Sequence, residues 1–147
     1  MFINLKKNFK FQIDEIPSND EDKALVNIFL TNDLFNVSLT NSKLLTLGDL
    51  KRFQYYLESL IDDSIQSNGT LTFSCKEIEV DFHKKYDVRN ESSVLFVDPN
   101  FGVIEYYIDF KINLKNKGRI TKDFIFIRMN KDEVITLNEY IKSKITI

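Results

Sequence analysis

Alternation of apolar and polar residues is clearest from Val103 to Leu114, where the sequence reads VIEYYIDFKINL. This pattern predicts a strand with one buried face and one face in water. The same alternation from Phe9 to Ile13 predicts an earlier strand that begins near Ile3. Strands are therefore expected at the start of the chain and in its second half.

Two further apolar runs, Leu25 to Leu30 and Leu34 to Leu39, lie close together in the sequence. Thr31, Asn32 and Asp33 separate them, and residues of these types favour turns because their side chains bond to the local backbone. The two runs therefore predict a β-hairpin.

The stretch from Leu47 to Gln66 carries apolar residues at three- and four-residue steps, at Leu50, Phe53, Leu57, Leu60, Ile61 and Ile65. This spacing predicts a helix that packs on a sheet by one side. Thr46 is placed to cap its first turn, and Asp49 complements the positive end of the helix. Asn68 and Gly69 are expected to end it.

The run that follows Gly69 changes its alternation partway along. Leu71 and Phe73 share one parity, whereas Val80 and Phe82 share the other. Because no glycine or proline marks a turn, we predict one strand with a bulge near Lys76.

The next segments alternate between polar and apolar character. Tyr86 to Ser92 is polar and is expected to be a loop, and Val94 to Val97 predicts a short strand. Asn116, Lys117 and Gly118 favour a tight turn, which would return the chain through a strand at Phe124 to Met129.

A second helix is predicted at about 137–145 because Thr136 and Glu139 have the spacing of a capping box. A similar Thr-Leu-x-acid sequence, at 46–49, precedes the first predicted helix. Since few residues match, we interpret this recurrence as repeated capping chemistry. A duplicated sheet-and-helix unit is the alternative.

With 147 residues, 43% of them hydrophobic, the chain is long enough for one domain with a real core, and we expect a single domain over 1–147. The pattern predicts an α+β fold. A mostly antiparallel curved sheet would carry one long helix, at about 47–66, and one short C-terminal helix on its apolar face.

Charge and cysteine content limit the expected binding partners and the expected cellular compartment. Twenty basic and 22 acidic side chains give a net charge of -2, so no global field draws the protein to nucleic acid or membrane. The single cysteine excludes an internal disulfide, no signal peptide is evident, and no apolar run is long enough to span a bilayer. We expect a cytoplasmic protein.

The sequence carries no recognisable catalytic motif. His83 is the only histidine and is interpreted as a surface residue at a strand end, and Cys75 as a small core residue. The four glycines are isolated, which argues against a phosphate-binding loop. We therefore predict no catalytic residue, no metal site, no cofactor and no enzymatic activity.

Two charged clusters are candidate interaction surfaces. Basic residues gather around the predicted C-terminal hairpin, at Lys111, Lys115, Lys117, Arg119 and Lys122. They lack interleaved exposed aromatic residues, so we interpret them as a solvated hairpin tip and do not expect direct nucleic-acid binding.

The second cluster is acidic and is spread over two predicted strands. Its residues alternate with apolar positions at Glu77, Glu79, Asp81, Glu105, Tyr107 and Asp109. If the two strands share one sheet with matching polarity, they form an acidic face with an exposed tyrosine. Such a face would bind a basic protein partner through charge complementarity. A solvated outer sheet face is the simpler interpretation of the same pattern.

The order of elements resembles the WapI type of bacterial immunity proteins, which protect a cell from a toxin delivered by its neighbours. The likeness is carried by four segments, TLGDLKRFQYYLESLI, GTLTFSCKEIEVDF, GVIEYYIDFKINL and DFIFIRMNKDEVITLNEYIKSKI. The resemblance implies a cytoplasmic, non-enzymatic protein that occludes the active site of a toxin, often a nuclease. The predicted partner is then a basic toxin domain.

Two other functions fit the same sequence. A small-ligand-binding or enzymatic domain would have a pocket between sheet and helix, with Tyr55 or Tyr56 turned inward. A phage or mobile-element accessory protein that binds a host factor would use the same acidic surface on a different partner.

Overall fold

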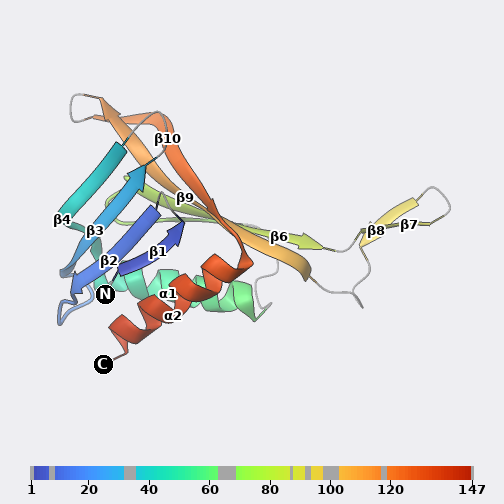
Figure 1. The fold of residues 1–147 in the computed structure, drawn as a ribbon, viewed down its shortest axis with the longest axis horizontal. Helices are drawn as coiled ribbons and strands as arrows, with labels where there is room; N and C mark the ends of the chain where they lie inside the picture. The colour runs from blue at the N-terminus through green and yellow to red at the C-terminus, as the bar shows by residue number, and fades with distance from the viewer. Residues whose placement is uncertain are drawn as a thin grey trace.

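The computed structural model describes residues 2–6, 9–31, 36–62, 69–86, 88–91, 94–97, 103–116 and 119–146. Figure 1 shows an α+β fold, as predicted. In chain order its elements are β1 (Phe2–Lys6), β2 (Phe9–Glu15), β3 (Lys23–Thr31), β4 (Asn36–Thr46), α1 (Leu47–Ile61), β5 (Gly69–Thr72), β6 (Ile78–Tyr86), β7 (Val88–Glu91), β8 (Val94–Val97), β9 (Val103–Asn116), β10 (Arg119–Met129) and α2 (Lys131–Ile145).

The first sheet has the strand order β1-β2-β3-β4, and every neighbouring pair is antiparallel. The predicted N-terminal strand is therefore two strands, β1 and β2. The predicted hairpin is confirmed by the pairing of β3 with β4. Of its predicted turn residues, Thr31 ends β3 and lies opposite Asn36, while 32–33 lie outside the described residues. Along β2, Phe9, Phe11 and Ile13 are buried, as their alternation predicts.

Helix α1 begins where the sequence predicts. The Thr46 hydroxyl accepts a hydrogen bond from the Asp49 N–H, and the Asp49 carboxylate accepts one from the Thr46 N–H, which completes a capping box. The helix ends at Ile61, not near Gln66. Asn68, predicted to end it, lies outside the described residues, and Gly69 already opens β5.

The second sheet has the order β10-β9-β6-β5. The predicted bulge at Lys76 is wrong, because β5 and β6 pair antiparallel on either side of a turn. Lys76 has a φ of 61°, the left-handed conformation that glycine most often supplies. Its N–H donates to the Phe73 carbonyl oxygen at 2.9 Å, which closes the turn without a glycine.

The predicted loop at Tyr86 to Ser92 is also wrong, since 88–91 form β7. This strand pairs antiparallel with β8, and the two make a ribbon that projects from the sheets (Figure 1). The predicted C-terminal hairpin is confirmed by the pairing of β9 with β10, where Asn116 lies opposite Arg119. Its loop, 117–118, lies outside the described residues.

Helix α2 starts at Lys131, earlier than the predicted start near 137. The helix cap is Asn130, whose side chain accepts a hydrogen bond from the Glu133 N–H, and Glu133 reciprocates. Thr136, the predicted cap, lies inside the helix and donates its hydroxyl to the Asp132 carbonyl oxygen. The predicted capping box at Thr136 and Glu139 is therefore wrong.

Replacing Asn130 with alanine is expected to lower the free energy of unfolding by about 1 kcal/mol, because the cap accepts a bond that nothing else in the helix can accept. The matched control is Thr136→Ala, which we expect to change stability by less than about 0.5 kcal/mol, since alanine suits a helix interior. Urea denaturation measures both. A larger loss for Thr136→Ala than for Asn130→Ala would contradict the assigned cap.

The chain consists of two halves with the same architecture. Each half is a four-stranded antiparallel sheet whose strands follow chain order, and each is followed by a helix with a capping box. The β7–β8 ribbon is inserted in the second half. The described strands therefore form two four-stranded sheets and this ribbon, where the sequence predicts one curved sheet.

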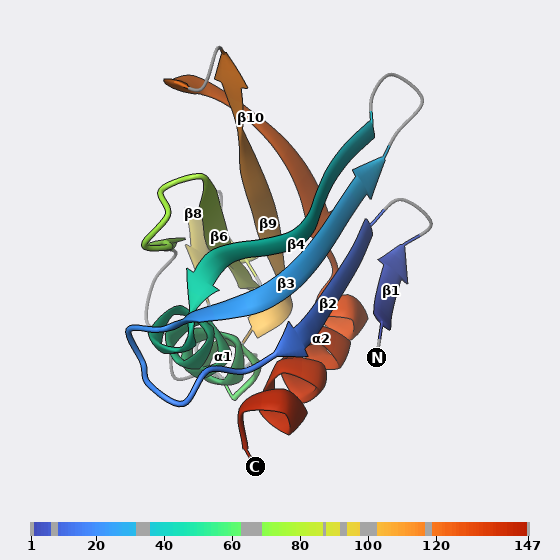
Figure 2. The same cartoon turned by 90° about the vertical axis from the view of Figure 1, so that its left-hand side faces the viewer.

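The two sheets lie against each other, with the helices at one end (Figure 2). Buried apolar side chains of both sheets and both helices form one core cluster. Phe110 of β9 lies 5.2 Å from Phe9 and 6.3 Å from Phe11, ring centre to ring centre, and 6.4 Å from Phe53 of α1. Helices α1 and α2 lie side by side at one end of the sheets, where Gln54 donates to Asn138 at 3.2 Å. Neither helix has the length and apolarity to cross a membrane.

Candidate functional site

Strands β6 and β9 are antiparallel neighbours, so the condition for the predicted face is met. Asp81 lies opposite Asp109, and His83 lies opposite Tyr107. Paired residues point to the same side of a sheet. Four of the six predicted residues, Glu79, Asp81, Tyr107 and Asp109, thus share the face turned away from the core.

We call this surface the outer face. Its described residues include Thr70 and Thr72 of β5, Glu79, Asp81 and His83 of β6, Tyr107, Asp109 and Lys111 of β9, and Phe124, Phe126 and Arg128 of β10. The opposite side of the same strands carries core residues such as Val80, Ile108 and Ile127. The outer face is therefore the only side of the second sheet open to a partner among the described residues.

The other two predicted residues are placed differently. Glu77 lies in the turn before β6, where its carbonyl oxygen accepts a hydrogen bond from the Asn113 N–H at 2.7 Å. Glu105 belongs to β9 and lies opposite Lys85, but its side chain is outside the described residues.

The outer face also contains two cations that the predicted acidic face did not include. One of them, Lys111, was assigned to the solvated hairpin tip, and this interpretation is wrong because its side chain is only 23% exposed. Lys111 Nζ lies 3.3 Å from a carboxylate oxygen of Asp81 and 3.5 Å from one of Glu79. Arg128 donates to both oxygens of Asp109, at 2.9 and 3.1 Å. These ion pairs make the net negative charge of the outer face smaller than the acidic residues of β6 and β9 alone would give.

The pairing also fixes the charge of Lys111. Burial lowers the pKa of its ammonium group, but the hydrogen bonds and negative charges of Asp81 and Glu79 outweigh burial and hold the pKa above its ordinary value. Lys111 therefore remains positively charged beside both acids at neutral pH.

Tyr107 is held on two sides. The His83 ring stacks on it with centroids 4.6 Å apart, and the Arg128 guanidinium lies 4.3 Å from its ring centroid. The predicted exposed tyrosine is therefore half-buried. Phe126, which lies opposite Lys111 in the neighbouring strand, is the exposed aromatic residue of this face, with 61% of its surface accessible.

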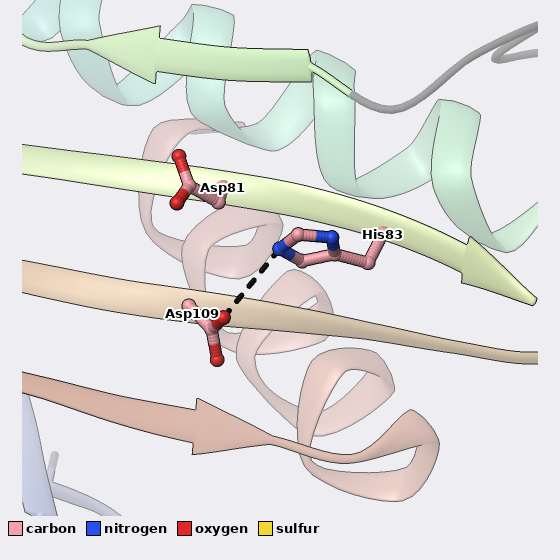
Figure 3. Close-up of side chains that lie close together, drawn as sticks. All are labelled: Asp81, His83 and Asp109. Atoms are coloured by element: carbon pink, nitrogen blue, oxygen red, sulfur yellow. Dashed lines mark ion pairs between the residues drawn. The ribbon is translucent and has the colours of Figure 1, made fainter.

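Side chains of Asp81, His83 and Asp109 converge at the centre of the outer face (Figure 3). One ligating atom from each lies within 4.8 Å of the other two. His83 Nε2 is 3.4 Å from Asp109 Oδ2, and Asp109 is only 8% exposed. His83 is thus a member of a half-buried cluster, and the interpretation of it as an ordinary surface histidine is wrong.

The two tyrosines that the alternative pocket would turn inward are not buried, although the ring of Tyr56 lies 5.5 Å from that of the core residue Phe82. Tyr55 is 66% exposed and Tyr56 is 40% exposed, both on α1. Cys75 is half-buried against the core, as predicted for a small core residue. Burial raises the pKa of its thiol, so the thiol stays protonated and weakly nucleophilic at neutral pH.

Part of the outer face could be predicted from the sequence. Lys111 continues the polar parity of Glu105, Tyr107 and Asp109, so its place on the same face follows from alternation alone. Phe126 could not be placed in this way, because 124–127 are apolar at every position and give no parity. Comparison with known proteins adds no assignment: no family model, no curated protein and no solved structure matches this chain.

Proposed function

We propose that this protein is a non-enzymatic immunity protein that uses the outer face to bind a toxin domain and cover its active site. The observation that carries the proposal is Phe126, a large apolar side chain that is 61% exposed on a sheet face with five charged residues. The resemblance of the chain to WapI-type immunity proteins supplies the class of partner.

The surroundings of Phe126 have the composition of a binding site. Energetically dominant interface residues are most often aromatic or arginine, and a polar rim surrounds them. Phe126 lies opposite Lys111, and Arg128 and Tyr107 follow along the same face. The ion pairs of Lys111 and Arg128 hold these neighbours in place before binding, which lowers the entropy lost on association.

Charge complementarity favours a basic partner, although less strongly than the acidic residues alone would. Glu79, Asp81 and Asp109 carry three negative charges, and Lys111 and Arg128 carry two positive ones, so these five residues sum to -1. Charges of this kind steer encounter and orientation, whereas buried apolar area supplies most of the affinity. Phe126 is therefore the expected anchor.

The contacts of His83 support a role in binding over one in catalysis. A histidine that acts as a general base needs a nucleophile within hydrogen-bond reach. The contacts of His83 described above are with an aromatic ring and a carboxylate. Occlusion of the toxin, which needs no chemistry, fits these contacts.

The proposal predicts that a gene beside this one encodes a secreted protein with a toxin domain, and co-expression with that domain tests it. The wild-type chain is expected to restore growth of cells that produce the toxin domain, and Phe126→Asp is expected to abolish protection, since it places a charge at the anchor. Tyr55→Asp, which changes an equally exposed aromatic residue on α1, is the matched control and should protect fully.

Two results would overturn the proposal. If the wild-type chain does not protect, the immunity function is wrong. If the wild type protects and Phe126→Asp protects equally at the same cellular level, the function stands but the outer face is not the binding surface.

A further inference from the structure

The cluster of Asp81, His83 and Asp109 has a chemistry that the docking proposal does not use (Figure 3). Two residues come from β6, and Asp109 comes from β9, directly opposite Asp81. Like charges directly opposite each other destabilise a sheet, and Lys111 beside Asp81 and Arg128 beside Asp109 offset part of this repulsion. A pair of facing carboxylates with an imidazole beside them is a potential cation site.

The position of His83 Nε2 favours a role in coordinating a metal ion. This atom is buried and has no hydrogen-bond partner among the residues that the structure describes. Its distance to Asp109 Oδ2 is 3.4 Å, which is longer than a normal N–H···O bond. Two ligands bound to one tetrahedral zinc ion at about 2.0–2.1 Å lie about 3.4 Å apart. The observed spacing therefore matches an edge of a metal coordination sphere.

Neighbouring side chains fix the orientation of all three groups. Thr70 donates its hydroxyl to Asp81 Oδ1 at 2.7 Å, and Arg128 holds Asp109 through both oxygens. Tyr107 stacks on the imidazole ring of His83. Hydrogen bonds and packing of this kind are what orient the ligands of natural metal sites.

We propose that Asp81, His83 and Asp109 bind one divalent transition-metal ion of the zinc class. One imidazole nitrogen and two carboxylate oxygens are a donor set that suits Zn²⁺. The three acids and two cations of this face sum to -1, so a divalent ion adds to a site that is not already positive. Three protein ligands leave a fourth position for water.

Because His83 is the only histidine, its imidazole nitrogens give the only histidine side-chain signals in a ¹⁵N NMR spectrum of the native sequence. Addition of Zn²⁺ alone to chelator-treated protein is expected to shift the Nε2 signal and to saturate at one ion per chain. An Nε2 signal that does not change at saturating Zn²⁺ would overturn the proposal. This measurement uses the wild-type protein, so it does not depend on a variant folding.

Calorimetric titration of variants with Zn²⁺ locates the carboxylate ligands. Asp81→Asn keeps the shape of the side chain but removes its charge, and we expect at least about 100-fold weaker binding, since loss of neighbouring orienting groups alone costs 10–100-fold. Glu79→Gln is the matched control, because Glu79 also pairs with Lys111 but is outside the cluster, and it should retain near wild-type affinity. Equal affinities for Asp81→Asn and wild type would place the ion elsewhere and overturn the site.

Discussion

Replacing Phe110 with alanine is expected to lower the free energy of unfolding by about 3–5 kcal/mol, the largest effect that we predict for a single substitution. Phe110 is fully buried, and its ring contacts Phe9 and Phe11 of the first sheet and Phe53 of α1. The substitution therefore opens a cavity where the two halves of the chain meet. Small domains have about 5–15 kcal/mol of stability, so the variant should still fold.

Urea denaturation of Phe110→Ala and Phe126→Ala gives a matched comparison, since the chemical change is identical. Phe126 is exposed on the outer face, and its removal is expected to change stability by less than about 0.5 kcal/mol. A cost for Phe110→Ala no larger than that for Phe126→Ala would contradict the packing of the two sheets around Phe110.

Replacing Asp49 with alanine is expected to cost about 2–4 kcal/mol. Its buried carboxylate accepts hydrogen bonds from the Thr46 N–H at 2.9 Å, and from the Ser74 N–H and hydroxyl at 3.2 and 2.9 Å. Asp49 thus caps α1 and also ties the helix to the turn between β5 and β6. Its loss leaves these donors without their acceptor.

The Asp49 carboxylate also predicts a pH dependence. Burial raises its pKa, but the hydrogen bonds from Thr46 and Ser74 and the bond from Arg52 outweigh burial and hold the pKa below the ordinary value of 3.8. The stabilisation is therefore fully present above the pKa of the unfolded chain, and it is lost as the pH falls through the lower pKa of the folded protein.

Free energies of unfolding measured from neutral pH into the acid range test this assignment. The wild type should lose more stability on acidification than Asp49→Asn, whose side chain does not titrate there. Asp20→Ala is the control, because Asp20 forms an exposed ion pair with Lys51 and should cost less than about 0.5 kcal/mol at any pH. An acid-induced loss that is the same in wild type and Asp49→Asn would show that Asp49 does not contribute to it.

The sequence predicted helix starts correctly where a capping residue directly precedes a long run of helical apolar spacing. Thr46 and Asp49 lie next to a long apolar period, so the start of α1 follows from the sequence. The start of α2 was missed because β10 runs to Met129, so Asn130, the cap of the helix, is the only residue between strand and helix. Thr136 and Glu139 offered a competing signature of the same kind.

The sequence could not predict which residues lie opposite each other on neighbouring strands, because the strand register depends on tertiary structure. Alternation places Glu79 and Asp81 on one face of a strand, but only the register of β6 against β9 puts Asp81 opposite Asp109. In the same way, the register of β10 against β9 sets Arg128 opposite Asp109 and makes the face mixed in charge. The turn at Lys76 was missed because a lysine adopts a backbone conformation that sequence rules assign to glycine.

Isothermal titration calorimetry of the purified chain with the toxin domain that the proposal predicts tests the proposed docking surface most directly. Phe126→Ala is expected to raise Kd by at least about 30-fold, which corresponds to about 2 kcal/mol for an anchor residue. Tyr55→Ala, at an equally exposed position on α1, should leave Kd within about threefold of wild type. Unchanged affinity in Phe126→Ala, or a comparable loss in Tyr55→Ala, would contradict the assignment of the outer face as the binding surface.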